Sequence, residues 1–520
     1  MRRFDAVAIG SGINALVAGA LLARRGWSVC VLERNDWLGG AIRTAEITEP
    51  GFVHEVFASW HPLFTGSAAY AELKEELATR GVEYLNTDLP TATLFPDGTA
   101  RFMTTSHEQN VAELGPGWDA TVAEFLPNAD LAFGVLSTEL WSRHGGKLGW
   151  KAFRRFGRRG LVEFSGNLLT SCRDWTAETF EDERAWGIFA PWVLHTGLGP
   201  DAASSGFMAQ VIGVAIELGG MPVPRGGGVK LVEALAGIIG DAGGTCETGR
   251  EVERIVLESD RATGVRTADG EVIEATRAVL AGVTPTALYG SLLGTDPGTM
   301  SESLSLEARR FRYGRGAMQI HFALSESPRW GGDARLGRTA IVHLTPGLDG
   351  VSRAVNEADR GLLPAEATVV VGQPMAVDPS RAPKGAWILW IQLQEIPAQL
   401  KGDAAGEIDT SGGWTEDVRE AYADRIQARI AAHAPGFDAT VLHRVALSPV
   451  DIEAANPNMV GGDIYSGSCA LDQNLIWRPR PGLPGHRTQV DRLWHIGAST
   501  HPGPGLGAGS GTLVAKALAK

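Results

Sequence analysis

Cysteine is scarce in this chain of 520 residues: its four copies lie at positions 30, 172, 246 and 469, and no two of them form a Cys-x-x-Cys pair. This spacing fits neither a disulfide framework, nor a zinc site, nor a dithiol reductase, so we expect no bound metal. So few cysteines without a pairing pattern are typical of a reducing compartment, and we predict a cytoplasmic protein.

Basic charge and long apolar runs are lacking as well. The 47 Lys and Arg residues are outnumbered by 60 Asp and Glu residues, which gives a net charge of −13. A general nucleic-acid surface requires a positive field, so we expect no nucleic-acid partner. No uninterrupted apolar stretch reaches the roughly 18 residues of a spanning helix, and Asp5 with the early glycines interrupts the segment that a signal peptide would need. We expect a soluble or surface-attached protein of two to four domains.

The first forty residues follow a strand–helix–strand pattern. Residues 4–9 form a short apolar run, a helical pattern follows, and residues 28–32 form a second apolar run. Between the first strand and the helix, Gly10 permits a tight turn and Gly12 lets the backbone approach a pyrophosphate at the helix N-terminus. This pattern predicts a dinucleotide-binding unit, and a glycine-rich turn without a ligand is the alternative.

Further residues in this region specify the nucleotide. Ala15 is small enough for the helix to pack on the sheet, and Glu33, at the carboxyl end of the second strand, is placed to accept hydrogen bonds from a ribose diol. Gly39 and Gly40 supply a second close approach to phosphate, and Arg43 carries donors for phosphate or for the electron-rich edge of a flavin. These additions favour FAD over NAD, although a structural salt bridge would also account for Arg43.

The middle of the chain changes from helical to alternating patterns. Residues 221–228 form a turn-rich passage that leads into a helical pattern, and short strands with an Asp-Gly hairpin signal follow it. We expect these strands to extend the sheet that begins at the N-terminus. Residues 63–215 are largely helical in pattern and residues 317–395 contain runs typical of an antiparallel sheet, so the two insertions are expected to form one substrate region.

The last thirty residues contain a second glycine-rich loop. A short strand precedes it, residues 499–511 hold five glycines and two prolines, and a regular helical pattern follows. A helix N-terminus presented by such a loop offers unpaired N–H groups and a positive dipole end. Beside a reduced flavin it would stabilise the negative charge that develops there. A flexible tail is the alternative, but it would not end in so regular a helix.

Three blocks of the chain resemble the phytoene dehydrogenase and carotenoid desaturase/isomerase-like flavoproteins, namely residues 8–44, 221–235 and 496–511. Residues 461–481 resemble the branch of that family described as dehydrogenase-related. The resemblance implies an α/β fold: a Rossmann-type, glutathione-reductase-like FAD-binding domain with a discontinuous chain, plus an α+β substrate domain with an antiparallel sheet and a helical cap. The implied FAD-binding segments are 1–62, 215–290 and 440–520, and the implied substrate-binding segments are 63–214 and 291–439.

The cofactor contacts of the family carry over to matching positions of this chain. The predicted FAD-binding residues are Gly10, Gly12, Asn14, Ala15, Glu33, Arg34, Gly39, Gly40, Arg43, Val252, Gly497, Gly503, Gly505 and Leu506. In this set Val252 is expected to meet the adenine through its backbone, and the residues from Gly497 onward would hold the ribityl and pyrimidine end. Pro504 stands where the family commonly has glycine and removes one backbone donor, so we expect the pyrimidine contact to differ in detail.

The resemblance also implies the reaction: an FAD-dependent dehydrogenase that desaturates a C–C bond of an apolar substrate, with hydride transferred to flavin N5. The middle third contains no second GxGxxG, so we expect electrons to enter from an organic substrate rather than from NADPH. The predicted catalytic residues are Arg43 and His501, the latter as the base that accepts the proton, and His61 and Asp463 are further candidates for that base. A backbone-bonded structural role is the alternative for His501.

Other activities fit the same scaffold. A redox-neutral, flavin-dependent isomerase or saturase of a polyene would use reduced flavin as its working form. An amine or alcohol oxidase and a non-catalytic lipid-binding relative are further alternatives, although the intact phosphate loops argue against the last. The expected partner is a hydrophobic small-molecule substrate.

Residues 141–164 form a basic segment on an otherwise acidic chain. The segment holds seven Lys and Arg residues with no acid between Glu139 and Glu163, and Trp150 and Phe153 lie near one helical stripe. We predict a membrane-surface contact through which a lipophilic substrate enters. A solvated basic face and a subunit contact are the alternatives.

Overall fold

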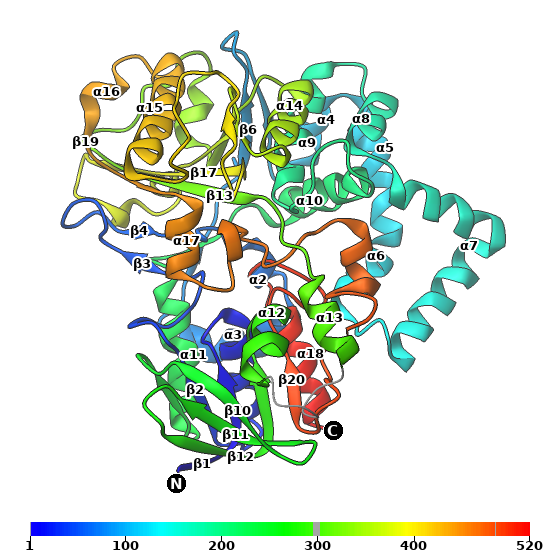
Figure 1. The fold of residues 1–520 in the computed structure, drawn as a ribbon. Coiled ribbons are helices and arrows are strands. Elements are labelled where there is room, and N and C mark those ends of the chain that lie inside the picture. Colours follow the sequence, from blue (N-terminus) through cyan, green and yellow to red (C-terminus); the bar gives the residue numbers. More distant parts are fainter. Residues whose placement is uncertain (1, 295–301, 484) are drawn as a thin grey trace.

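Two seven-stranded sheets organise the molecule, one in the lower body and one in the upper body as drawn in Figure 1. The structure is a computed structural model and describes residues 2–294, 302–483 and 485–520. Positions 295–301 of the second predicted insertion therefore lie outside the described residues. Within the described part, no helix combines the length and the apolarity needed to cross a bilayer.

The first sheet has the strand order β10-β11-β12-β1-β2-β9, with β20 beside β12. Its central pairs are parallel and its β10-β11-β12 edge is an antiparallel meander. The side chains of β2 are buried on both faces of the sheet, as a parallel strand covered by helices requires. The bounds of its strands are β1 (Arg2–Ile9), β2 (Val29–Leu32), β9 (Thr245–Glu247), β10 (Val252–Glu258), β11 (Arg261–Thr267), β12 (Val272–Ala281) and β20 (Leu493–His495).

Helices from both ends of the chain cover the first sheet. α1 (Ile13–Ala23) contacts α11 (Val229–Asp241) on one side and α18 (Gly509–Leu518) on the other. All the residues of α1 are buried, because it packs against the sheet and against both of these helices. The core beneath them contains Leu16 of α1 and Leu235 of α11. The first and last parts of the chain thus share one hydrophobic core.

The second sheet has the order β19-β13-β17-β16-β14-β6-β7 and is antiparallel except for the β14–β6 pair. Alternate side chains of β16 face opposite cores: Val369 and Val371 pack toward α15 (Glu416–His433), and Val370 packs toward the helical cap. Its strand bounds are β6 (Thr91–Leu94), β7 (Ala100–Met103), β13 (Gly316–Leu324), β14 (Ile341–Leu344), β16 (Val369–Gly372), β17 (Trp387–Ile396) and β19 (Val441–Leu447).

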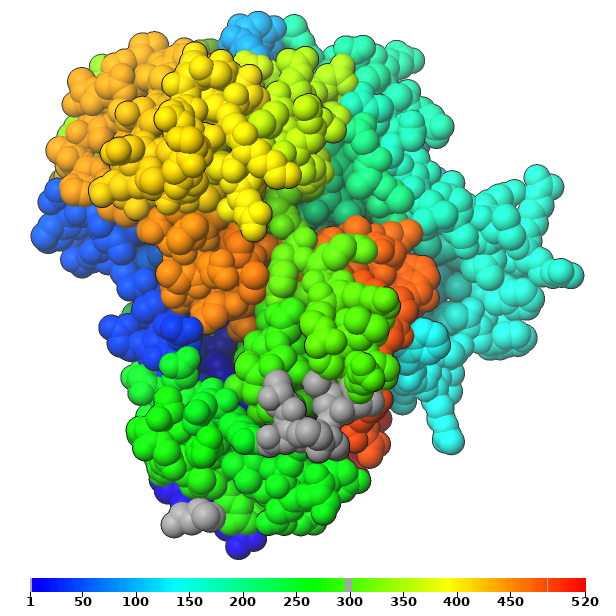
Figure 2. Space-filling view, in the orientation of Figure 1, coloured from blue at the N-terminus to red at the C-terminus, as the bar shows by residue number. Residues whose placement is uncertain are grey.

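Seven helices form the cap on the second sheet. Their bounds are α4 (His107–Leu114), α5 (Pro116–Phe125), α6 (Ala129–Ser137), α7 (Arg143–Leu169), α8 (Cys172–Thr179), α9 (Glu183–Leu194) and α10 (Ser205–Gly219). The long helix α7 projects from the body at the right of Figures 1 and 2. It kinks at Gly157, whose φ is 65°, and none of its side chains is buried.

Shorter elements connect these layers. The small strands are β3 (Thr44–Ala45), β4 (His54–Glu55), β5 (Tyr84–Leu85), β8 (Val223–Pro224), β15 (Leu362–Leu363) and β18 (Gly402–Asp403). The remaining α-helices are α2 (Pro62–Thr65), α3 (Ala68–Thr79), α12 (Pro285–Ala287), α13 (Glu302–Arg309), α14 (Leu348–Asp359), α16 (Phe437–Thr440) and α17 (Pro449–Ala455).

The predicted fold class is confirmed, but the structure moves three of the predicted domain boundaries. α3 packs in the core of the first sheet through Leu73, although residue 63 was the predicted start of the substrate segment. α13 packs through Leu304 on the other face of the same sheet. β19 pairs with β13 in the second sheet rather than with the first. An apolar face packs on the core that is nearest in space, and the order of residues along the chain does not reveal which core that is.

Candidate active site

One cavity of about 1380 Å³ lies between the two sheets. Its lining combines the glycine turn after β1, the loop before α18, one face of β17 and one side of α10. Single-ligand pockets usually measure roughly 300–1000 Å³. The cavity is therefore large enough for a cofactor at one end and a substrate at the other, and it brings together the two ends of the chain as the sequence predicted.

The glycine turn after β1 forms one wall of the cavity. Gly10 has a φ of 83°, which favours glycine, and a Cβ atom on Gly12 would meet no atom within 4 Å. Gly12 and Gly39 form a parallel bridge, so the second predicted glycine pair lies directly beside the first. A bare backbone that faces open space is the surface that a pyrophosphate needs.

Glu33 directly follows β2 and is a nearly buried carboxylate, 6% exposed. One oxygen accepts hydrogen bonds from the backbone N–H (3.0 Å) and hydroxyl (2.7 Å) of Ser11, and the other accepts from the backbone N–H of Asn35 (3.0 Å). A carboxylate has about four lone-pair sites. Three are used within the protein, so one acceptor site remains for a ligand hydroxyl in the cavity that Glu33 lines.

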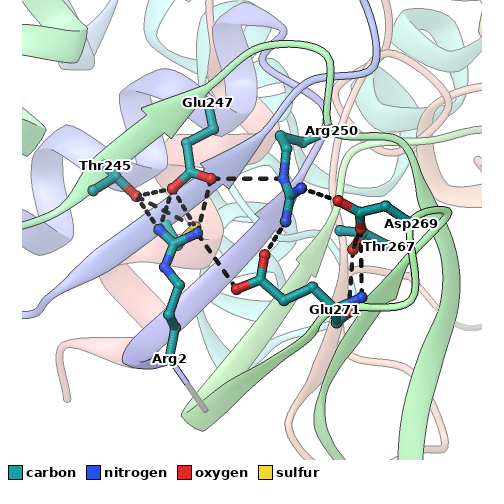
Figure 3. Close-up of polar contacts among 8 residues, drawn as sticks. Arg2, Thr245, Glu247, Arg250, Thr267, Asp269 and Glu271 are labelled. Atoms are coloured by element: carbon teal, nitrogen blue, oxygen red, sulfur yellow. Dashed lines mark hydrogen bonds and ion pairs between the residues drawn. The ribbon is translucent and has the colours of Figure 1, made fainter.

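An ion-pair network, shown in Figure 3, supports the wall of the cavity near Glu33. Arg250 lines the cavity and pairs with Asp269 and Glu271, and it lies 3.7 Å from Glu247. Glu247 in turn accepts a hydrogen bond of 2.9 Å from Arg2. The backbone N–H of Arg250 donates to the carbonyl of Glu33 over 2.7 Å. These contacts hold the segment that leads into β10 and Val252 against the end of β2.

The loop between β20 and α18 forms the opposite wall. The Gly497 N–H donates to the Ser510 hydroxyl over 3.1 Å, which ties the start of the loop to the first turn of α18. The Gly511 N–H donates to the side-chain oxygen of Asn14 over 3.0 Å, which joins α18 to α1. Gly509, the first residue of α18, lines the cavity. The positive end of the helix dipole is therefore directed at the cavity.

The predicted cofactor-binding residues line this cavity with one exception. Those in the lining are Gly10, Gly12, Asn14, Ala15, Glu33, Arg34, Gly39, Gly40, Val252, Gly497, Gly503, Gly505 and Leu506. Arg43 is the exception, because its guanidinium stacks on the ring of Trp37 at 3.8 Å instead of reaching the cavity. The bare glycine backbone, the nearly buried acceptor and the helix N-terminus together fit a dinucleotide such as FAD.

The bases suggested by the sequence lie outside the lining. His501 is buried behind the glycine loop, where burial and the nearby His486 lower its pKa to about 4. His61 bonds to the hydroxyl of Tyr84 over 3.0 Å. Asp463 accepts three backbone hydrogen bonds of 2.7–2.9 Å, two from its own loop and one from Gly314, so its oxygens hold these two segments together. The glycine loop turns its backbone toward the cavity, so the side chain of His501 points into the protein behind it.

A histidine that the sequence did not single out lines the cavity. His195 follows α9, and its Nε2 lies 3.1 Å from Nε2 of His343 on β14. The ring of Trp192 packs on His195 at 4.4 Å between centroids. Burial lowers the pKa of His195 to about 3, so the ring is neutral at pH 7. Neither histidine has a local sequence signal, because only the fold brings them together.

The substrate end of the cavity is apolar. The charged side chains of the described lining all belong to the nucleotide end of the cavity: Glu33, Arg34, Arg250, Glu251 and Lys516. The opposite end is lined mainly by aromatic and aliphatic side chains, among them Trp60, Trp192, Met208, Val211, Ile212, Ile216, Met221, Ile341 and Trp390. This wall suits an uncharged, apolar molecule.

Comparison with known proteins agrees with this geometry. The family model "Flavin containing amine oxidoreductase" matches residues 16–355. One of the subunits of limonene dehydrogenase from Castellaniella defragrans is 26% identical, with 100% of this chain and 95% of that protein aligned. Phytoene desaturase (neurosporene-forming) from Cereibacter sphaeroides is 25% identical, with 98% of this chain and 94% of that protein aligned.

Solved structures share the fold. An oxidoreductase from Methanosarcina mazei superposes with a TM-score of 0.60 at 16% identity, covering 98% of this chain and 99% of that one. Cyclohexylamine oxidase from Brevibacterium oxydans gives 0.58 at 15% identity, covering 99% and 98%. The family match spans more than half of the chain, and the predicted cofactor FAD and the predicted enzymatic, phytoene dehydrogenase-like character are confirmed. The chain belongs to the family of flavin-containing amine oxidoreductases and is an FAD-dependent oxidoreductase.

Proposed function

We propose that this protein is an FAD-dependent dehydrogenase that oxidises a C–C bond of an apolar organic substrate to C=C. The observation that carries the proposal is the uncharged, aromatic and aliphatic end of a cavity whose other end suits the nucleotide. A carboxylate would stabilise a buried cationic amine, and the described residues at the substrate end include none. An amine oxidase activity is therefore disfavoured.

The residues predicted from the sequence that line the cavity would hold the nucleotide. Glu33 would accept a hydrogen bond from a ribose hydroxyl, the backbone at Gly12 and Gly40 would contact the pyrophosphate, and the backbone at Val252 would contact the adenine. The loop from Gly497 and the N-terminus of α18 would contact the pyrimidine end, where the helix dipole would stabilise negative charge. We assign Arg43 no contact with the cofactor. Its guanidinium stacks on the ring of Trp37 and supports that side chain.

The chain's own side chains orient the substrate and remove its proton. FAD supplies the acceptor for a hydride and its two electrons when it is bound. Trp192 and Trp390 form apolar walls that orient the substrate and exclude water. The neutral ring of His195 accepts the proton from the neighbouring carbon, and His343 fixes the orientation of that ring through the Nε2–Nε2 hydrogen bond. The electron pair that held this proton would then form the second bond of the new C=C, as the hydride leaves the adjacent carbon with its own pair.

Anaerobic mixing of the purified yellow protein with candidate substrates tests the proposal. Limonene, phytoene and putrescine serve as probes, and the flavin absorbance is followed in time. Bleaching by an apolar hydrocarbon supports desaturation. Conversion of a polyene only after prior reduction of the flavin would instead establish an isomerase or saturase, and bleaching by putrescine alone would contradict the proposal.

We also propose that α7 contacts an anionic membrane surface. Trp150 and Val162 are 61% and 73% exposed, and α7 projects freely from the body (Figure 2). The cavity lining includes exposed Leu63 and Leu218 and the half-exposed Phe133 of α6, which packs beside α7. An apolar rim next to a basic, aromatic helix supports entry of a lipophilic substrate from a membrane. A subunit contact or a solvated basic face is the competing interpretation.

A further inference from the structure

The buried side chain of His486, 4% exposed, lies between two segments that are far apart along the chain. Its Nδ1 lies 2.5 Å from a carboxylate oxygen of Glu139, in the connection between α6 and α7 (138–142). Its Nε2 lies 2.7 Å from the backbone carbonyl oxygen of His501, in the flavin loop, residues 496–508 between β20 and α18. One ring therefore joins the base of the projecting helix α7 to a wall of the cavity.

Both partners of the His486 ring are hydrogen-bond acceptors. A backbone carbonyl has no proton to donate, so Nε2 must carry one. The hydrogen bond from His486 lowers the pKa of Glu139, so that carboxyl group is ionised at pH 7 and Nδ1 must carry a proton as well. A neutral imidazole has one N–H group, and an imidazolium has two. The geometry therefore requires the doubly protonated, positively charged ring.

Two further titratable groups lie beside this ring, and neither opposes its charge. Burial lowers the pKa of His495 and of His501 to about 4, so both are neutral at pH 7. The backbone N–H of His495 donates to the carbonyl of His486 over 2.7 Å, which fixes the segment that carries the ring beside β20. Glu139 is therefore the counter-ion of a buried cation, and a buried charge is stable when it is paired and hydrogen-bonded.

Each end of this link continues into the lining of the cavity. On the loop side, residues 502–505 directly follow His501 and line the cavity. On the helix side, Leu136 and Ser137 line it, and Glu139 comes just after them in the chain. Charge-assisted hydrogen bonds are roughly twice as strong as neutral ones. Separation of the loop from the end of α6 would break at least one of these bonds.

We infer that His486 is an imidazolium that positions the flavin loop, because it ties this loop to the α6–α7 connection. The ring does not line the cavity, so it acts on the cofactor only through the loop that it holds. FAD would be retained because the loop cannot move away from the end of α6. This role concerns the hold on the cofactor and is independent of which substrate is oxidised.

Two measurements on the intact flavoprotein test the inference. Nitrogen NMR of selectively labelled histidine at pH 7 is expected to show a proton on both ring nitrogens of His486, assigned by the signals that His486→Phe removes. Release of FAD is followed by the fluorescence of the freed flavin after dilution. His486→Phe is expected to release FAD at least about tenfold faster than the wild type, because it removes both hydrogen bonds.

Two substitutions of Glu139 separate the hydrogen bonds from the packing. Glu139→Gln supplies an N–H to a neutral His486 ring, so FAD release should stay within about threefold of the wild type while one ring proton disappears. Glu139→Leu supplies no partner and is expected to release FAD about tenfold faster. This pair of variants also tests the link if His486→Phe fails to fold.

His443→Phe is the matched control. His443 also faces a carboxylate, that of Glu49 over 3.4 Å, but it is exposed on β19, so its replacement should leave FAD release unchanged. A wild-type His486 ring with one unprotonated nitrogen at pH 7 would overturn the inference. FAD release from folded His486→Phe no faster than from His443→Phe, or from Glu139→Leu as slow as from the wild type, would overturn it as well.

Discussion

At the scale of single residues, Glu33 joins three segments of the nucleotide end. Its carboxylate holds the N–H groups of Ser11 and Asn35, and the Ser11 hydroxyl in turn accepts from the Gly39 N–H over 3.0 Å. We expect Glu33→Arg to lose most of its FAD on purification, because the longer cation both breaks these bonds and occupies the ribose position. The ratio of flavin to protein absorbance measures the occupancy.

The control for this prediction is Glu258→Arg. Glu258 is an exposed carboxylate at the end of β10, paired with Arg261 over 3.0 Å, and exposed pairs contribute little. Its flavin occupancy should match that of the wild type. Equal flavin occupancy in Glu33→Arg and in this control would show that Glu33 does not lie at the ribose of the cofactor.

His195 is proposed to accept the substrate proton, so its replacement should slow the chemical step itself. We expect His195→Phe to slow substrate-dependent bleaching of the flavin by about 10²-fold or more, because general-base catalysis typically contributes 10²–10⁴-fold. FAD occupancy should stay unchanged, and added imidazole should restore part of the rate to His195→Ala. The matched comparison is His501→Phe: a larger loss in that variant would favour the histidine predicted from the sequence.

At the scale of elements, the proposed membrane contact of α7 depends on its basic side chains. Part of its basic charge is already neutralised, because Lys151 and Arg155 both pair with Asp130. Arg143, Lys147 and Arg154 are further cations on the same helix. We expect the protein to float with vesicles that contain anionic lipid, and replacement of these three by Ser to weaken binding markedly, since each basic residue contributes about 1 kcal/mol near such a surface.

High salt provides the control for α7. Added salt should release the wild-type protein from anionic vesicles, and neutral vesicles should bind it less, because the attraction is electrostatic in part. Failure of the wild-type protein to float at low salt would contradict a membrane role. In that case a concentration-dependent change of mass that disappears in the triple variant would indicate a subunit contact.

Elements formed by neighbours in sequence were predictable from their patterns. β1, α1 and β2 follow one another with the glycines at the turn, and α11, the β10–β12 meander and α18 have equally clear local periods. The pairing of β19 with the second sheet was missed, because strand order depends on long-range contacts. The same reason hid the pair of His195 and His343, which are 148 positions apart and carry no motif.

At the scale of the whole molecule, one buried cation joins the two domains. Arg381 is 1% exposed, pairs with Glu55 (2.8 Å) and Asp378 (2.7 Å), and donates to the carbonyl of Pro224. Glu55 also accepts from the Gly228 N–H at the start of α11. Arg381→Met would leave two carboxylates buried without their cation, so we expect a loss of about 3–5 kcal/mol of stability.

Thermal unfolding measures this effect, with Arg329→Met as the control. The side chain of Arg329 is 75% exposed, and its pair with Glu326 is expected to contribute at most about 1 kcal/mol. A similar unfolding temperature in both variants would show that Arg381 does not join the domains.

Buried histidines make the whole fold sensitive to mild acid. Burial lowers the pKa from 6.5 to about 3 for His61 and to about 4 for His321 and His495. Below pH 6.5 the unfolded chain binds protons that the folded chain does not, so stability is full above pH 6.5 and falls as the pH drops toward 4. Each such histidine contributes about 1.4 kcal/mol per pH unit in this window.

Unfolding temperatures at pH 7.5 and pH 5.5 test this expectation. The window lies above the range in which most carboxylates titrate, and Glu55, whose pKa is raised by burial, acts in the opposite direction. We expect a lower unfolding temperature at pH 5.5, with a smaller decrease in His61→Gln and an unchanged decrease in the exposed-site control His443→Gln. An equal or higher temperature at pH 5.5 would refute the histidine argument.

The junction of α1 with α18 has a consequence for biosynthesis. Asn14 and Gly511 are 497 positions apart, so the ribosome completes the first half of this junction long before the second. At about 5–20 residues per second, the nascent amino-terminal unit waits roughly 25–100 s for its partner helix. During that interval the face of α1 that α18 covers stays exposed, so the growing polypeptide presents apolar surface of the kind that chaperones bind. Capture of the flavin is therefore expected only after α18 has been synthesised.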